Sequence, residues 1–160
     1  MRIAIVDGLG HGPAAAEAAT AATDALRDKP DLDPAAALHA CDRALRGTRG
    51  AAASVLWIDG SRVVFAGVGN VDGRIFNGSA AERRCSPDRG VLGRGIRAPH
   101  VLEFPLGEDW TVVLHSDGIS SRAEISELKL DADVETIARS ALERWARPTD
   151  DATIVIARRL

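Results

Sequence analysis

Cysteines are scarce in this sequence. Only Cys41 and Cys85 occur among its 160 residues, and their spacing matches neither a zinc-binding motif nor a redox-active motif. Disulfide-stabilised proteins of oxidising compartments normally contain more cysteines than this. We therefore expect two reduced thiols in a cytoplasmic protein.

Long hydrophobic runs and an excess of one charge are also missing. No apolar run approaches the roughly 20 residues of a membrane-spanning helix, and residues 2–6 are too few for the core of a signal peptide. The formal net charge is −3, and acidic and basic residues are mixed along the chain. We therefore expect neither a nucleic acid nor a membrane as a partner.

The sequence does contain enough apolar residues for a sizeable core. Hydrophobic residues make up 46% of the chain, which argues against disorder. A length of 160 residues is typical of one domain, so we expect a single domain over residues 1–160.

The order of the predicted elements indicates an α+β fold. Antiparallel strands in the middle of the chain, with helices grouped before and after them, are typical of layered α+β domains. The strand 54–58 is apolar on both faces and needs cover on both sides, which two stacked sheets with outer helices provide. Helices are expected over residues 13–28, 34–46 and 134–147, and strands over 2–6, 51–58, 61–69, 71–76, 80–84, 100–104, 110–116 and 152–159.

Three expected strand ends carry aspartates. Asp7 ends the first apolar run, Asp117 ends another, and the pair Asp150 and Asp151 precedes the last one. Glycine follows both Asp7 and Asp117, which lets the backbone approach a ligand closely. Clustered carboxylates are the ligands that hard divalent cations prefer, so the sequence predicts a metal site.

A plain turn is the competing interpretation, because Asp-Gly is an ordinary turn dipeptide. The chain contains four such dipeptides. We assign those at 59–60 and 72–73 to turns or loops. Those at 7–8 and 117–118 differ, because each ends a strongly apolar run that no matching hairpin strand follows.

Other polar residues leave alternatives open. His11 is either a proton donor to a leaving group or, as we favour, a solvated residue beside the site. We expect His115 to be buried and hydrogen-bonded. Arginines 83, 84, 89, 94 and 97 surround a glycine-rich loop, where they either hold a phosphorylated segment or, as we favour, are simply solvated.

Five segments occur in the order typical of one family. They are residues 6–12 (VDGLGHG), 67–70 (GVGN), 90–93 (GVLG), 115–118 (HSDG) and 150–153 (DDAT). In these segments the chain resembles the SpoIIE-type phosphatases, bacterial members of the metal-dependent protein phosphatase (type 2C) superfamily. Residues 48–54 are similar to the stressosome phosphatases within that family.

The resemblance implies an αββα sandwich of two antiparallel sheets flanked by helices, with two Mn²⁺ or Mg²⁺ ions at one end. It implies that a metal-activated water hydrolyses phosphoserine or phosphothreonine. Asp7 and the carbonyl of Gly8 match the metal-bridging motif, and Asp117 and Asp150 match the other acidic ligands. Asp151 would then not bind a metal directly but would accept hydrogen bonds from backbone donors or from a metal-bound water.

Two departures from the family pattern affect these expectations. Family members have a further strand with a Gly-Asp or acidic pair upstream of the Asp7 motif, so we expect a sandwich lacking the N-terminal strand or strands. Residues 1–7 are then expected to lie in a protein–protein contact or against a missing domain. In addition, Asn70 stands where animal relatives have an acid. A neutral amide binds cations poorly, which argues against a tightly bound third ion.

The resemblance also implies a partner. The expected substrate is a phosphorylated STAS-domain regulator of a stress or sigma-factor pathway, and an anti-sigma kinase domain is a further partner. The alternative is a pseudophosphatase that binds such a regulator or kinase domain without turnover. A third and weaker interpretation is a hydrolase of small phosphate esters.

Overall fold

A computed structural model describes residues 1–78, 82–120, 122–128 and 130–159. The predicted strand 80–84 lies partly outside these residues. In chain order the elements are β1 (Arg2–Gly8), α1 (Pro13–Arg27), α2 (Pro34–Ala44), β2 (Ala51–Asp59), β3 (Arg62–Val68), β4 (Asp72–Asn77), β5 (Arg83–Cys85), β6 (Leu102–Pro105), β7 (Trp110–His115), the 3₁₀ helix η1 (Ile125–Glu127), α3 (Val134–Trp145) and β8 (Ile154–Arg159).

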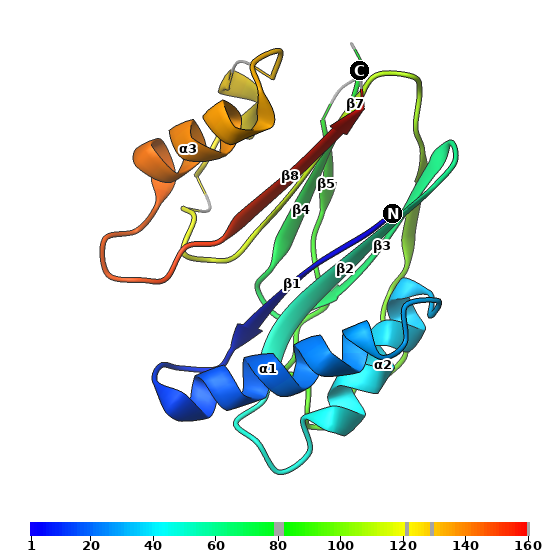
Figure 1. The fold of residues 1–160 in the computed structure, drawn as a ribbon, viewed down its shortest axis with the longest axis vertical. Helices are drawn as coiled ribbons and strands as arrows, with labels where there is room; N and C mark the ends of the chain where they lie inside the picture. Colours follow the sequence, from blue (N-terminus) through cyan, green and yellow to red (C-terminus); the bar gives the residue numbers. More distant parts are fainter. Residues whose placement is uncertain (79–81, 121, 129, 160) are drawn as a thin grey trace.

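The strands form two antiparallel sheets that stack face to face. One sheet has the order β1-β2-β3-β6 and the other β5-β4-β7-β8. Helices α1 and α2 cover the outer face of the first sheet, and α3 covers the outer face of the second (Figure 1). The expected αββα sandwich is therefore confirmed. Among the described strands β1 pairs only with β2, so it forms an edge of its sheet.

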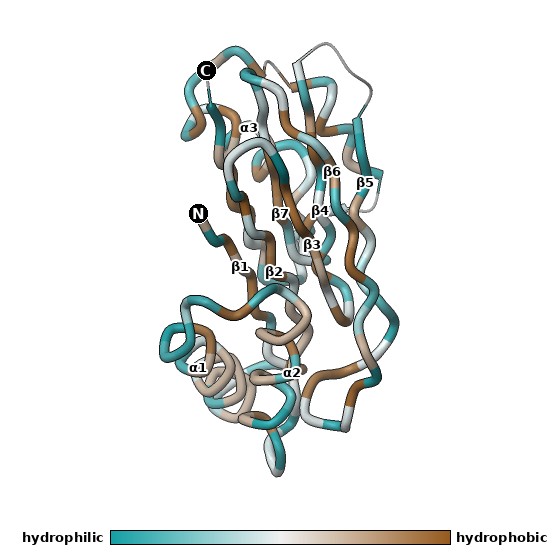
Figure 2. Tube along the Cα trace, turned by 90° about the vertical axis from the view of Figure 1, so that its right-hand side faces the viewer, coloured by the Kyte–Doolittle hydropathy of each residue, from teal (hydrophilic) through white to brown (hydrophobic). Residues whose placement is uncertain are grey.

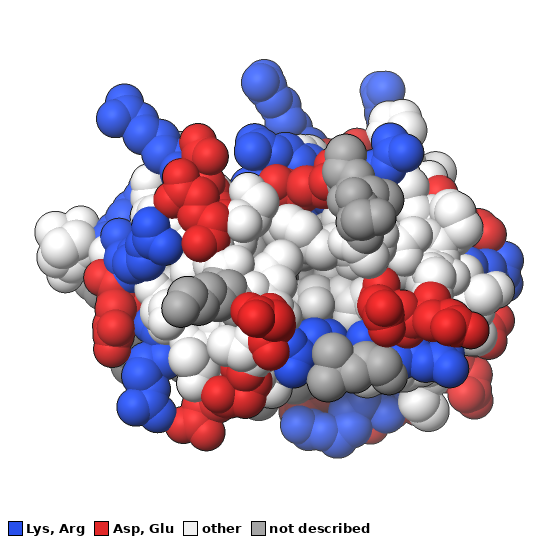
Figure 3. Space-filling view, turned by 90° about the horizontal axis from the view of Figure 1, so that it is seen from above, with Lys and Arg blue, Asp and Glu red and all other residues white. Residues whose placement is uncertain are grey.

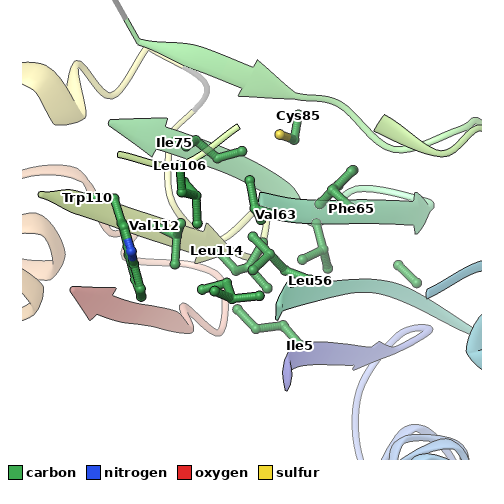
Figure 4. Close-up of a cluster of buried hydrophobic side chains, with 13 residues drawn as sticks. Ile5, Leu56, Val63, Phe65, Ile75, Cys85, Leu106, Trp110, Val112 and Leu114 are labelled. Carbon is green, nitrogen blue, oxygen red and sulfur yellow. The ribbon is translucent and has the colours of Figure 1, made fainter. Parts of the chain in front are cut away.

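The space between the sheets is filled by side chains from both inner faces (Figure 4). Leu56 of β2 and Phe65 of β3 meet Ile75 of β4 and Leu114 of β7, all at most 1% exposed. Hydropathy follows the same division, with apolar residues along the strands and polar residues on the connecting loops (Figure 2). Burial of this apolar surface is the main stabilising term of the sandwich.

The outer face of β2 shows why the chain is rich in alanine. Ala51, Ala53 and Val55 point away from the sandwich interior and pack against Ala18 of α1 and Leu38 of α2. Small side chains on both layers let the helices lie close to the sheet without leaving voids. Burial on both faces of β2 confirms that this strand needs cover on both sides.

Helix starts follow the local sequence signals. Pro13 occupies the first turn of α1, where its missing N–H costs nothing. The carboxylates of Asp33 and Asp133 cap α2 and α3 by accepting the backbone N–H of Ala36 and Thr136, respectively.

One expectation about these elements is wrong. Asp72 and Gly73 lie inside β4, opposite His115 and Leu114, because Gly73 provides the space that Cys85 and Phe65 fill. Within the described residues, the strand expected over 80–84 corresponds to β5, Arg83–Cys85.

Charge is distributed without a dominant sign over the end of the molecule near the C-terminus, where Lys and Arg alternate with Asp and Glu (Figure 3). None of the helices in the described ranges is long and apolar enough to span a membrane.

Candidate metal centre

The three predicted carboxylate positions meet at one end of the sandwich. The loop after β1 and the segment leading into β8 both lie at this end (Figure 1). Together they border a pocket of about 190 Å³. It is lined by Asp7, Gly8, Leu9, Gly10, Ala52, Asn70, Asp117 and Asp150. Two sheets and three separate chain segments thus contribute acidic side chains to one small space.

Backbone pairing and helix packing fix the position of Asp7. Asp7 is the second-to-last residue of β1 and lies opposite Ala52 of β2, just before the glycine-rich loop. At Gly8, a Cβ would lie 2.1 Å from the carbonyl oxygen of Ala15, so only glycine allows α1 to pack here. The Leu9 N–H donates to the Gly50 carbonyl over 3.0 Å, which directs the loop back toward the sheet.

Hydrogen bonds between their neighbouring residues hold Asp117 and Asp150 close to each other. The Ser116 N–H donates to the Thr153 carbonyl, and the Thr153 N–H donates to Ser116 Oγ, both over 3.0 Å. A Cβ at Gly118 would lie only 2.0 Å from the carbonyl oxygen of Asp151. The segment that follows β7 and the segment that precedes β8 are therefore held against each other at one end of the second sheet.

Asn70 lies within the pocket and orients one of its carboxylates. Its Nδ2–H donates to Asp117 Oδ2 over 2.6 Å. The preceding Gly69 has φ of 107° and hydrogen-bonds through its N–H to the Asp88 carbonyl, which turns the chain so that Asn70 reaches across to the other sheet.

Repulsion between the acidic side chains affects the pKa of Asp7. Burial raises the pKa of Asp7, and the negative charges of Asp117, Asp150 and Asp151 raise it further. A cluster of oxygen donors that repel one another is suited to a divalent cation, which relieves the repulsion and replaces the lost hydration. The residues present therefore fit hard metal ions.

The carboxylates do not converge on a single point. Across the residues that the structure describes, no three His, Cys, Asp or Glu side chains are arranged to hold one ion. Two of the carboxylates accept hydrogen bonds within the protein: Asp117 Oδ2 from Asn70 Nδ2, and Asp150 Oδ1 from the Asp151 N–H.

The other predicted residues lie around this pocket. His11 is exposed and borders an outer hollow of about 530 Å³, together with Asp150 and Asp151. Asp151 does not line the inner pocket. His115 is 2% exposed, and its Nδ1 hydrogen-bonds to the Ser116 carbonyl oxygen at 3.1 Å, as expected for a buried histidine. Burial lowers the pKa of His115 and so favours the neutral imidazole.

Sequence reasoning missed one cation at the site. The Arg49 guanidinium lies over Gly10, with Nη1 2.7 Å from where a Cβ of that glycine would stand. Arg49 is exposed on the α2–β2 connection, far from Gly10 along the chain. The only available signal was that the segment 48–54 resembles the stressosome phosphatases, and that likeness assigned no role to the arginine.

Comparison with known proteins gives a consistent result. The model of the family described as Stage II sporulation protein E (SpoIIE) matches residues 1–160. The Phosphoserine phosphatase RsbX of Bacillus subtilis (strain 168) is 27% identical over 157 residues, which cover 96% of this chain and 78% of RsbX. The crystal structure of RsbX in complex with magnesium superimposes with a TM-score of 0.90 at 25% identity, covering 99% of this chain and 81% of RsbX.

Two further solved structures are similar. One belongs to a study of the bacterial stressosome as a modular system adapted to control secondary messenger signaling, with TM-score 0.87, 28% identity, and coverage of 99% of this chain and 84% of the other. The catalytic domain of the serine threonine protein phosphatase PstP in complex with 2 manganese ions has TM-score 0.73 and 16% identity, with coverage of 99% and 86%. At that identity, the second likeness concerns the fold alone.

Proposed function

Because the chain belongs to the SpoIIE family, we propose that it is a metal-dependent phosphoserine/phosphothreonine protein phosphatase. One observation carries the proposal: Asp7, Asp117 and Asp150 come from three separate segments and line one pocket at the end of the sandwich. A protein that only binds a partner has no need for three mutually repelling carboxylates in one space.

The residues that would hold two Mn²⁺ or Mg²⁺ ions follow from their places in the pocket. Asp7, the carbonyl of Gly8, Asp117 and Asp150 would hold these ions, as the family resemblance implies and as their common pocket supports. When bound, such ions lower the pKa of a water molecule and neutralise phosphoryl oxygens. The crystal structure of RsbX in complex with magnesium supports this choice of cofactor.

The chain's own residues would position the substrate around these ions. Asn70 donates to Asp117 and so fixes which carboxylate oxygen faces the pocket. Arg49, exposed above Gly10, is placed to bind the anionic phosphoryl group with its planar guanidinium. The wide hollow beside His11 leaves room for a protein substrate rather than enclosing a small ester.

The substrate we propose is a phosphorylated regulator with a STAS domain, in a stress or sigma-factor pathway. The support for it is the likeness to RsbX and to the stressosome structure. An anti-sigma kinase domain is a further proposed partner, and the cytoplasm is the proposed location.

A direct assay tests the proposed activity. Turnover of p-nitrophenyl phosphate and of a phosphoserine peptide is measured with Mn²⁺, with Mg²⁺ and with excess EDTA. We expect turnover that requires metal and that falls by at least about a hundredfold in Asp117→Asn. The control Asp31→Asn removes an exposed carboxylate outside the pocket and keeps full activity. Undiminished turnover of Asp117→Asn in EDTA contradicts the proposal, and a protein inactive under all conditions favours the pseudophosphatase.

A further inference from the structure

A second pocket, larger than the aspartate pocket, lies in the glycine- and arginine-rich loop that precedes β6. Its volume is about 460 Å³, and its lining includes the side chains of Arg89, Arg94 and Arg97. Val91 and Ile96 contribute an apolar part to the wall. The three arginines therefore lie around one concave surface, so that a single ligand could contact all of them.

Two carboxylates hold this loop in place through hydrogen bonds to its backbone. Asp42 of α2 is 5% exposed, and its Oδ1 accepts the N–H of Gly93 over 2.7 Å and the N–H of Gly95 over 3.1 Å. At the ends of the loop, the Asp88 carboxylate accepts the backbone N–H of His100 and contacts its Nδ1. These hydrogen bonds lower the pKa of Asp88. The loop is thus anchored at its middle and at both ends.

The pocket carries a net positive charge, because three arginines and a single carboxylate line it. None of the carboxylates in the described part of the chain forms an ion pair with Arg89, Arg94 or Arg97, whereas several other arginines do form such pairs. The one carboxylate in the lining, Asp88, is engaged by His100. Three arginines that form no ion pair outnumber this one carboxylate, so the pocket attracts a ligand with negative charges.

The arginine pocket adjoins the aspartate pocket. Arg94 donates from Nη2 to the Arg49 carbonyl over 3.5 Å, and the Arg49 guanidinium lies over Gly10, which lines the aspartate pocket. On the other side, the Gly69 N–H donates to the Asp88 carbonyl, and Asn70 follows in the chain. The loop that bears the arginines therefore borders the aspartate pocket through Arg49 and through the segment before Asn70, so that one bound polypeptide could contact both pockets.

We propose that the arginine pocket binds acidic side chains of the protein substrate that flank its phosphoserine. This proposal rests on the proposed phosphatase function, and it adds a substrate class, namely phosphoproteins with Asp or Glu close to the phosphorylated residue. Guanidinium groups bind carboxylates with directed hydrogen bonds, and the apolar wall accommodates the methylene groups of Glu.

The test compares two phosphoserine peptides that differ only in their flanking residues, Glu in one and Gln in the other. With the wild-type protein and Mn²⁺ we expect kcat/KM to be about tenfold higher for the Glu peptide at low ionic strength, and the difference to shrink in high salt. In Arg89→Gln/Arg94→Gln/Arg97→Gln we expect kcat/KM for the Glu peptide to approach that for the Gln peptide. The matched control Arg27→Gln/Arg83→Gln/Arg84→Gln removes three exposed arginines outside the pocket and retains the preference.

Binding without turnover separates this proposal from the proposed function. The unphosphorylated Glu peptide is titrated into the protein in EDTA, where we expect binding by the wild type and by the control triple variant, and at least fivefold weaker binding by the pocket variant. If no substrate is turned over but this binding pattern holds, the phosphatase proposal fails and the pocket proposal stands. Equal kcat/KM for both peptides, or equal peptide binding by both triple variants, overturns the pocket proposal.

Discussion

Asn70 and Asp117 join the two sheets at the proposed metal centre through one hydrogen bond of 2.6 Å, from Nδ2 to Oδ2. Asn70 follows β3, and Asp117 follows β7, so the bond spans the gap between the layers. A neutral donor occupies one oxygen of Asp117 and leaves the other for a cation. An acid in place of Asn70 would instead add a further negative charge.

Removing this donor should weaken metal binding. In Asn70→Ala we expect the affinity for Mn²⁺, measured by calorimetry, to fall by about tenfold, because Asp117 loses the partner that orients it. As a control, Asn77→Ala removes an amide at the far end of β4, where it contacts Pro105 and Gly107, and should leave the affinity unchanged. Wild-type affinity in Asn70→Ala would mean that the hydrogen bond does not orient a ligand.

Without metal, Asp7→Asn should stabilise the fold. The pKa of Asp7 is raised above its unfolded value of 3.8, mainly by burial and then by its acidic neighbours. The folded state therefore keeps a proton that the unfolded chain has already released, and the free energy of unfolding falls as pH rises from about 4 through the folded pKa. At pH 7 we expect Asp7→Asn to raise the Tm of the metal-free protein by roughly 3 °C.

The same variant should lose stabilisation by metal. Adding Mn²⁺ raises the Tm of the wild type by mass action but leaves that of Asp7→Asn nearly unchanged. Scanning calorimetry from pH 4 to pH 8, with and without Mn²⁺, measures both effects. A metal-free Asp7→Asn protein that is less stable than the wild type at pH 7 would show that Asp7 has a structural role instead.

The two adjacent aspartates should differ in importance. Asp150 lines the inner pocket with Asp7 and Asp117, whereas Asp151 faces only the outer hollow. We expect Asp150→Asn to lose nearly all phosphatase activity and Asp151→Asn to keep a measurable part of it. Steady-state kinetics over a range of Mn²⁺ concentrations distinguishes the two, and the reverse order of damage would shift the ligand assignment by one residue.

Gly118→Ala should disrupt the packing of the segment that follows β7 against the segment that precedes β8. The new Cβ would lie 2.0 Å from the Asp151 carbonyl oxygen, so the segment before β8 must move. Gly118 is not among the glycines with positive φ, so the backbone itself would tolerate alanine and the cost comes from the contact alone. We expect a loss of about 2 kcal/mol or more in the free energy of unfolding, measured by urea denaturation, together with weaker Mn²⁺ binding. An unchanged unfolding midpoint contradicts this reasoning.

The two thiols should be unreactive in the native protein. Burial raises the pKa of Cys41 to about 11 and that of Cys85 to about 12. At pH 8 the thiolate fraction at such pKa values is about one in a thousand for Cys41 and about one in ten thousand for Cys85, so alkylation should be slow until the chain is unfolded in guanidinium. Above pH 9 the unfolded chain ionises first, and stability should therefore fall as pH rises. Rapid modification of either thiol at pH 8 in the native state would contradict the burial.

Much of the local structure could be predicted because it depends on neighbouring residues. The Asp33 cap, the Asp59-Gly60 hairpin and the periodic face of α3 each rest on a few consecutive positions. Asp72-Gly73 was misassigned for the same reason. The dipeptide resembles a turn locally, and only the side chains of Cys85 and Phe65, distant in sequence, show why glycine is needed within a strand.

The sequence by itself determined where the acidic side chains would stand along the chain, because apolar runs end at Asp7 and Asp117 and one begins after Asp151. Only the tertiary structure decided which of them share a pocket, since that depends on the stacking of two sheets. Asp150 rather than Asp151 lines the inner pocket, Arg49 lies over Gly10, and Asp42 anchors the loop of the arginine pocket. Each of these relationships joins segments that are far apart in the chain, and long-range packing, which local periodicity does not encode, brings them together.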